Sequence, residues 1–294
     1  MTVTDGYFTW HNDQWRTYYR IVGTPSAKAP LVLLHGGPGS THTYFEVLDG
    51  LAVRLDRQLI MYDQLGCGRS TIPTDPAVYR AETWVEELQA LRRHLKLEQI
   101  HLLGQSWGGM LAIIYLCDYA PSGVQSVILS STLSSARLWA QEQHRLLQYL
   151  PLTAQKALKQ AEVTGNYSGS AYQAADALFM QYYCRDRAVT NAEPLQREVR
   201  MGTESYVAAW GPNELVPQGT LKDYEYTDKL QQVKVPALIT SGTDDLCTPL
   251  VAKTMYDHLP NAQWELFAGA KHMAFAEQTT QYADLLDTWL AERQ

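Results

Sequence analysis

Short apolar runs alternate with segments of helical periodicity through the first 131 residues of the chain. Apolar runs typical of buried strands lie at residues 31–34, 59–62, 100–103 and 124–129. Between them, residues 81–95 and 107–119 place apolar side chains at helical spacing. Strands separated by helices of this length predict βαβ units and a mostly parallel sheet. We expect residues 14–22 to form an antiparallel edge strand, paired with a strand at about residues 7–10.

This alternation stops after residue 131 and resumes at about residue 236. Residues 132–235 are rich in Ala, Gln, Leu and Tyr, have a helical character, and contain no run typical of a buried strand. Further strands are then expected at residues 237–240 and 263–267, with helices at 250–258 and 275–293. A sheet that is interrupted and then continued predicts one domain with an insertion. We therefore expect an α/β core from residues 1–131 and 236–294, and a helical cap from residues 132–235.

Composition and charge exclude several classes of partner. The 294 residues carry 24 Lys and Arg against 31 Asp and Glu, a net charge of −7, and no Lys/Arg cluster that would bind nucleic acid or anionic lipid. The four cysteines form no CxxC pair, so a metal site is not predicted. The first 16 residues lack the apolar core of a signal peptide, and no apolar stretch reaches about 18 residues. These features predict a cytoplasmic protein without membrane insertion, and they leave loose association with the cell envelope and the oligomeric state open.

The strongest chemical signal is the sequence GQSWG at residues 104–108, which matches the pattern G-x-S-x-G. It lies between an expected strand and an expected helix, where a sharp turn leaves no room for side chains at the two glycine positions. Such a turn presents Ser106 as a nucleophile. The backbone N–H of Trp107, at the start of the helix, is then placed to stabilise an oxyanion.

A glycine-rich loop, HGGPG at residues 35–39, follows the expected strand at residues 31–34. A serine hydrolase needs a second N–H donor for the oxyanion, and a loop at this position can supply it. Gly37 is the candidate donor. A phosphate-binding loop is the competing interpretation, but the pattern G-x-G-x-x-G is not matched, and Pro38 lacks an N–H that a phosphate cradle would use.

A nucleophilic serine needs a base, which follows the nucleophile and the acid in the chain order of α/β-hydrolases. Three histidines follow Ser106: His144, His258 and His272. The first lies in the helical insertion and the second in an expected helix. His272 lies in a loop after the last expected strand, as a catalytic base requires.

The acid is expected after the preceding strand, where the sequence SGTDD occupies residues 241–245. We select Asp245, three residues after Gly242 and four before Pro249. Asp244 remains an alternative, because a shift of one residue in the turn would exchange the two carboxylates.

Four motifs together resemble one family. They are HGGPG at residues 35–39, the pattern YDQxGxGxS at 62–70, GQSWGG at 104–109 and GPNE at 211–214. In this order they resemble the proline iminopeptidases, prolyl aminopeptidases of the α/β-hydrolase class, and most closely the form found in lactic acid bacteria. The resemblance covers essentially the whole chain. It implies an α/β-hydrolase fold, cleavage of N-terminal proline from small peptides without a cofactor, and a triad of Ser106, Asp245 and His272.

An aminopeptidase must also hold the cationic amine of its substrate, for which a carboxylate is the suitable partner. Glu214 matches the amine-binding glutamate of the family. A second family carboxylate is expected just after the catalytic aspartate, but Leu246 occupies that place. Whether Asp244, Glu204 or no residue supplies a second charge therefore stays open.

We expect a serine aminopeptidase that forms an acyl-enzyme on Ser106, acts on small peptides with N-terminal proline, and needs no cofactor or metal. An amidase acting on prolinamide or other amino-acid amides, or an esterase with the same triad, is the nearer alternative. A non-catalytic binding protein is the more distant one, and it is disfavoured because no triad member is missing. A haloalkane dehalogenase is excluded, since it needs Asp at position 106.

Overall fold

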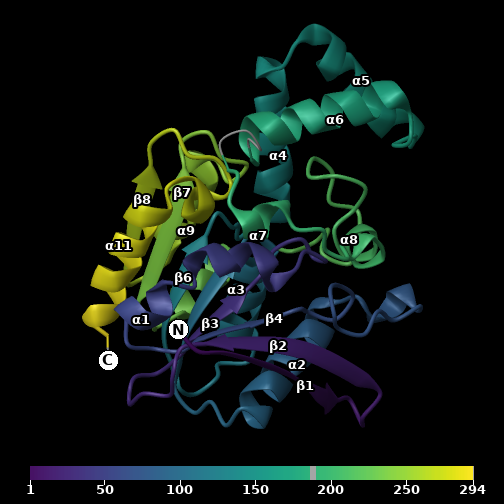
Figure 1. Ribbon diagram of the computed structural model, residues 1–294. Helices are drawn as coiled ribbons and strands as arrows, with labels where there is room; N and C mark the ends of the chain where they lie inside the picture. The colour runs from purple at the N-terminus through teal and green to yellow at the C-terminus, as the bar shows by residue number, and fades with distance from the viewer. Residues whose placement is uncertain (186–189, 294) are drawn as a thin grey trace.

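An eight-stranded sheet forms the centre of the molecule (Figure 1). The computed structural model describes residues 1–185 and 190–293. The strand order is β1-β2-β4-β3-β5-β6-β7-β8. The strands are β1 (Val3–Trp10), β2 (Trp15–Val22), β3 (Leu31–Leu34), β4 (Leu59–Tyr62), β5 (Ile100–Gln105), β6 (Val124–Ser130), β7 (Ala237–Gly242) and β8 (Ala262–Phe267). The pairs from β4 to β8 are parallel, as the apolar runs predicted.

The first two strands form an antiparallel hairpin that joins the sheet through β2. The prediction that residues 14–22 form an edge strand is wrong, because β2 lies between β1 and β4, and β1 is the edge. The sequence did not indicate the full length of β1 because Val3, Thr4 and Asp5 are exposed. The apolar pattern therefore identifies only β2, the inner strand of the hairpin, clearly.

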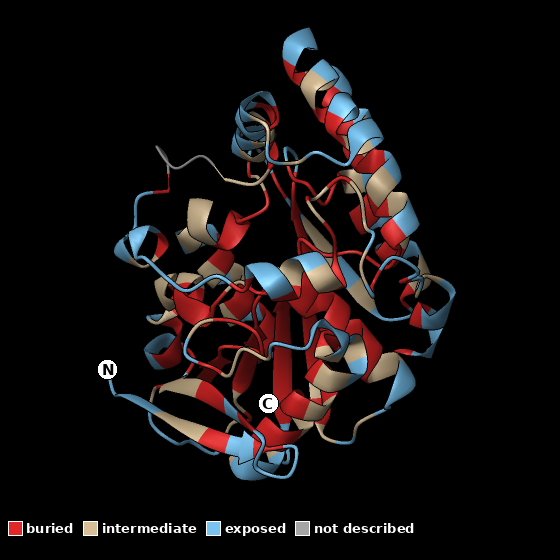
Figure 2. Ribbon diagram, turned by 90° about the vertical axis from the view of Figure 1, so that its right-hand side faces the viewer, coloured by how far each residue is buried: buried red, intermediate tan, exposed pale blue. Residues whose placement is uncertain are grey.

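Each strand of the parallel sheet contributes to two cores, because successive side chains point to opposite faces. Val32 and Leu34 belong to one buried cluster, and Leu31 and Leu33 belong to the other. The first face is covered by α2 (Ala81–His94), α3 (Trp107–Asp118) and α9 (Pro249–His258). The second is covered by η1 (His42–Leu48), α1 (Leu51–Arg54), α10 (Ala274–Glu277) and α11 (Thr279–Ala291). Figure 2 shows the resulting buried centre with exposed residues at the periphery.

The closing helix expected at residues 275–293 is two helices, α10 and α11, with a break at Gln278. The side chain of Gln278 donates to the carbonyl of Ala268 at 2.8 Å, and its backbone leaves the helical region at φ −127°. The Glu277 carboxylate, just before the break, accepts the N–H of Lys271 at 2.7 Å. The start of the closing helices is thereby joined to the loop that carries His272.

Helices and turns make up the described residues between β6 and β7, and no strand lies among them. They are α4 (Ala136–Leu146), η3 (Leu147–Tyr149), α5 (Leu152–Thr164), α6 (Ser170–Tyr183), α7 (Glu193–Gln196), α8 (Thr203–Ala209) and η4 (Asp228–Gln232). Outside this segment, a short 3₁₀ helix, η2 (Pro76–Val78), precedes α2. In Figure 1 the helices α4, α5 and α6 lie beyond the carboxyl ends of β7 and β8. Among the helices of the described ranges, none is long and apolar enough to cross a membrane.

Candidate active site

Ser106 occupies a strained turn between β5, which ends at Gln105, and α3, which begins at Trp107. Its φ is 54°, a conformation that non-glycine residues rarely adopt. A Cβ at Gly104 would lie 2.3 Å from the carbonyl oxygen of Gly108, and one at Gly108 would lie 1.9 Å from that of Leu34. The crowding predicted for the two motif glycines is therefore confirmed.

The base and acid expected from the sequence lie together. His272 Nδ1 is 2.7 Å from Asp245 Oδ1. Asp245 also accepts from Ser131 Oγ at 2.7 Å and from the backbone N–H groups of Gly242 and Cys247 at 3.1 and 2.7 Å. These donors fix the carboxylate in one orientation. The alternative acid, Asp244, is exposed and makes no such contact to the histidine.

The bond to Asp245 sets the tautomer of His272. With Nδ1 donating to the carboxylate, Nε2 is the nitrogen that can accept a proton. Burial disfavours the charged imidazole, but the carboxylates of Asp245, Glu214 and Glu277 together outweigh burial, and the pKa of His272 is raised above its ordinary value. In the described part of the chain, neither Ser106 Oγ nor His272 Nε2 makes a hydrogen bond. Such catalytic hydrogen bonds often tighten only when substrate binds.

The loop at residues 35–39 lies beside Ser106, because β3 pairs with β5 and places Leu34 opposite Gly104. The N–H of Gly36 donates to Tyr44 Oη at 2.6 Å. Among the described residues, the N–H groups of Gly37 and Trp107 donate to no protein acceptor. Gly37 has φ 112°, so a side chain there would be strained. Both expected oxyanion donors are thus unpaired and come from elements that meet at Ser106.

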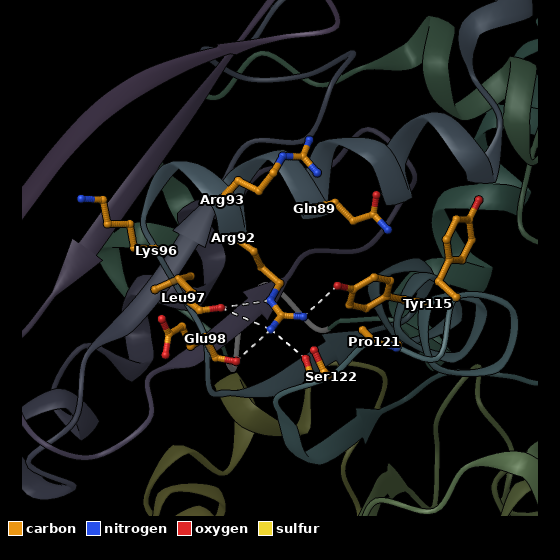
Figure 3. A pocket seen from close by; sticks show the side chains of 10 residues that line it. Gln89, Arg92, Arg93, Lys96, Leu97, Glu98, Tyr115, Pro121 and Ser122 are labelled. Carbon is orange, nitrogen blue, oxygen red and sulfur yellow. Dashed lines mark hydrogen bonds between the residues drawn. The ribbon is translucent and has the colours of Figure 1, made fainter.

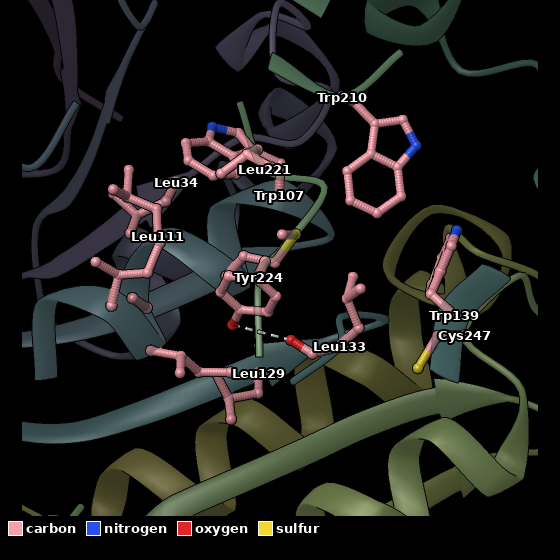
Figure 4. Packing of buried hydrophobic residues seen from close by; sticks show 14 of the residues in the cluster. Leu34, Trp107, Leu111, Leu129, Leu133, Trp139, Trp210, Leu221, Tyr224 and Cys247 are labelled. Atoms are coloured by element: carbon pink, nitrogen blue, oxygen red, sulfur yellow. Dashed lines mark hydrogen bonds between the residues drawn. The ribbon is translucent and has the colours of Figure 1, made fainter. Parts of the chain in front are cut away.

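The indole of Trp139 contacts both Glu214 and His272. Tyr206 Oη, on α8, donates to Glu214 Oε1 at 2.7 Å. The indole N–H of Trp139, on α4, donates to the Glu214 carbonyl at 2.9 Å, and the Trp139 ring centre is 6.0 Å from that of His272. Trp139 also packs edge-to-face on Trp210, with ring centres 6.4 Å apart (Figure 4). Burial raises the pKa of Glu214 above its ordinary value.

A carboxyl group that the sequence did not indicate acts on Glu214. Glu204 and Asp244, the two candidates, are both exposed. Asp176, on α6, is instead the carboxyl group whose charge acts on Glu214, adding to burial in raising its pKa. Burial raises the pKa of Asp176 as well. Asp176 belongs to none of the four motifs, and its helical position gave no signal of proximity to Glu214.

Two surface depressions lie outside this cluster. One, at the amino end of β5, surrounds Arg92 (Figure 3). The guanidinium of Arg92 donates to Tyr115 Oη at 2.8 Å and to the carbonyls of Leu97, Glu98 and Ser122, so its role is to hold the end of α2 to neighbouring loops. The other lies between α6 and the loop of His272 and is lined by Leu178, Gln181, Tyr182, Tyr183, Asp244 and Lys271.

The site has the groups that acyl transfer requires: a serine on a strained turn, a histidine held by a buried aspartate, and two unpaired N–H donors. In the described ranges, no group of three or more His, Cys, Asp or Glu residues is arranged to hold a metal ion. The serine, the histidine–aspartate pair and the two N–H donors together support nucleophilic displacement at a carbonyl.

Comparison with known proteins gives consistent matches along the chain. A family model described as the alpha/beta hydrolase fold matches residues 29–279. The chain is 60% identical over 292 residues to a proline iminopeptidase of Lactobacillus delbrueckii subsp. lactis, covering 99% of both proteins. It is 60% identical over 277 residues to that of Lactobacillus helveticus, covering 94% of both. The crystal structure of a proline iminopeptidase from Mycobacterium smegmatis superposes with a TM-score of 0.86, at 29% identity and 98% coverage of both chains.

Proposed function

Because the chain belongs to the proline iminopeptidases of the alpha/beta hydrolase fold, we propose that it releases N-terminal proline from small peptides by means of Ser106, Asp245 and His272. It is a prolyl aminopeptidase by this membership. The observation that carries the assignment of residues is the 2.7 Å bond between His272 Nδ1 and the buried Asp245. The carbonyl of His272 accepts from the side chain of Gln105, the residue before the strained turn at Ser106.

The reaction follows from the placement of these groups. His272 Nε2 takes the proton of Ser106 Oγ as the oxygen attacks the carbonyl carbon of the N-terminal prolyl residue. The resulting oxyanion accepts from the N–H groups of Gly37 and Trp107. His272 then transfers its proton to the leaving amine, and the C–N bond breaks to leave an acyl-enzyme. Water, deprotonated by the same histidine, attacks the ester, and proline leaves as Ser106 regains its proton.

Glu214 would bind the secondary ammonium of the N-terminal proline. Its carboxylate is oriented by Tyr206, and its backbone by Trp139, whose ring contacts the catalytic histidine. A substrate with a blocked N-terminus would lose the charge-assisted bond that an ammonium makes to this carboxylate. This arrangement favours an aminopeptidase over an esterase with the same triad.

The same reasoning supports a division of the chain. We propose residues 1–131 and 236–294 as the catalytic core and residues 132–235 as the cap that supplies the amine site, since Tyr206 and Glu214 both lie in this segment. We also propose a cytoplasmic location, which the four free cysteines support. Small peptides with N-terminal proline are the proposed partners.

Replacement of Ser106 by Ala tests the nucleophile. We expect the kcat for prolyl p-nitroanilide to fall by about 10⁴-fold or more, because the covalent step is removed. Ser26→Ala, at an exposed serine, is the control and should retain full activity. Substantial activity of the Ser106 variant would reject the mechanism. Equal cleavage of free and N-acetylated prolyl substrates by the wild-type enzyme would reject the amine site.

A further inference from the structure

One buried side chain contacts both sides of the proposed oxyanion site. Gln64, in the loop after β4, is 1% exposed. Its Nε2 donates to the His35 carbonyl at 2.8 Å, and its Oε1 accepts from the Trp107 indole N–H at 2.7 Å. His35 begins the loop that carries Gly37, and Trp107 supplies the second oxyanion donor.

The contact from Gln64 to His35 fixes the backbone of the loop at residues 35–39. The N–H of Gln64 also donates to His35 Nε2 at 2.9 Å, while His35 Nδ1 lies 2.9 Å from the Gly36 carbonyl. Burial lowers the pKa of His35 to about 4, so the ring is neutral, with Nδ1 as donor and Nε2 as acceptor. The orientation of the peptide unit that precedes Gly37 therefore depends on bonds that converge on Gln64.

The contact to Trp107 fixes the other donor. The Trp107 indole is buried and packs edge-to-face on Trp84, with ring centres 4.9 Å apart. Its N–H has Gln64 Oε1 as its partner. A side chain held by this packing and by a hydrogen bond restricts the backbone of the first residue of α3, whose N–H is the proposed oxyanion donor.

We propose that Gln64 is a positioning residue that sets the spacing between the Gly37 and Trp107 N–H groups. This inference rests on the proposed function, because it assumes that those two groups stabilise the oxyanion. A primary amide presents a donor and an acceptor at a fixed separation, and the two partners here are an acceptor and a donor. A carboxylate, a thioether or an alkyl group satisfies at most one of them.

Gln64→Met tests the bridge at nearly constant volume. An error of about 1 Å in the position of a catalytic group reduces the rate by about 100-fold. We expect kcat for prolyl p-nitroanilide to fall about 10- to 100-fold, with KM within about twofold of the wild-type value, since Glu214 and its partners are unchanged. An unchanged kcat, or a raised KM with normal kcat, would overturn the proposal.

Gln64→Glu gives a readout that a general loss of structure does not produce. An ionised carboxylate still accepts from Trp107 but faces the His35 carbonyl without a proton to donate. A protonated carboxyl restores both bonds, and burial raises its pKa. We therefore expect the ratio of variant to wild-type kcat to rise as the pH is lowered, while the ratio for Gln64→Met stays constant. A constant ratio for Gln64→Glu would also overturn the proposal, and this variant carries the test if Gln64→Met does not fold.

Ser126→Ala is the matched control. Ser126 is fully buried at the amino end of β6 and accepts from Trp289, with His101 Nδ1 2.7 Å away. Its loss should lower the melting temperature without reducing kcat, whereas an equal loss of kcat would show that any buried hydrogen bond has the same effect.

Ser106→Ala separates the two proposals. If Ser106→Ala is active, the proposed function is rejected. If Ser106→Ala is inactive but the Gln64 variants are fully active, only the positioning role of Gln64 is rejected.

Discussion

Two adjacent carboxylates in the loop after β7 differ in their burial and in their hydrogen-bond partners. Asp245 is buried and accepts from four donors, including His272, whereas Asp244 is exposed. We expect Asp245→Asn to lower kcat by about 10⁴-fold, because the amide favours the wrong histidine tautomer. Asp244→Asn should stay within about twofold of the wild type. Measurement of kcat for both variants decides between the two residues, and a larger loss in Asp244→Asn would reverse the assignment.

For Glu214 we predict an effect on substrate binding. A charge-assisted hydrogen bond contributes about 1.5–3 kcal/mol, so Glu214→Gln should raise KM for prolyl p-nitroanilide about 10- to 150-fold. Because burial raises the pKa of Glu214, its carboxylate is lost as the pH falls through that pKa. The wild-type KM should therefore rise at acidic pH, and the KM of the variant should not.

Glu204→Gln is the matched control, because Glu204 is an exposed carboxylate on α8, the helix that carries Tyr206. Steady-state measurement of KM across pH distinguishes the two variants. A KM for Glu214→Gln that equals that of the wild type would show that the amine binds elsewhere.

At the scale of elements, the start of α8 is wedged between two core loops. The Gly202 N–H donates to the Gly39 carbonyl at 2.7 Å, and a Cβ on Gly202 would lie 2.1 Å from the Gly66 carbonyl oxygen. Gly202→Ala should therefore displace α8 and Tyr206, lowering stability by about 1–3 kcal/mol and raising KM.

Gly169→Ala is the matched control for this change. Gly169 also precedes a helix, α6, but no atom lies within 4 Å of a Cβ built on it. Thermal melting and KM should be nearly unchanged in this variant. If Gly202→Ala behaved in the same way, the contact between α8 and the core loops would have no role in seating the amine site.

The elements that the sequence predicted best are the buried parallel strands. β3 and β4 have the bounds that their apolar runs indicated, because both faces of these strands are covered and each residue must be apolar. The outer hairpin and the closing helices were less well predicted. Their ends depend on particular contacts, such as the bond from Gln278 to Ala268, which no periodicity encodes.

At the scale of the whole molecule, the sequence predicted some residues of the candidate site and not others. Ser106, Asp245 and His272 follow carboxyl ends of strands, and a parallel sheet brings such ends to one edge, so motif and topology were sufficient to propose them. Asp176 and Trp139 approach Glu214 only through the packing of the helices between β6 and β7. Sequence separation between these residues carries no information on that packing.

A buried acid should make the stability of the whole molecule depend on pH. Glu87, on α2, is fully buried and accepts from Thr17 Oγ1 and from the Leu65 N–H. Burial raises its pKa from 4.5 to about 8. Between these values the folded chain holds a proton that the unfolded chain has released. The free energy of unfolding therefore falls as the pH rises through this window, by up to about 1.4 kcal/mol per pH unit, and levels off above about pH 8.

Two buried histidines oppose this trend only at lower pH. Burial lowers the pKa of His35 and His101 to about 4, so their contribution to stability rises with pH up to about 6.5 and is constant above it. The test therefore compares urea unfolding of the wild type and Glu87→Gln between about pH 6.5 and 8. The variant should lose the part of the downward slope that Glu87 causes. Glu82→Gln, an exposed position on the same helix, should keep it, and parallel curves for all three proteins would show that Glu87 is ionised in the fold.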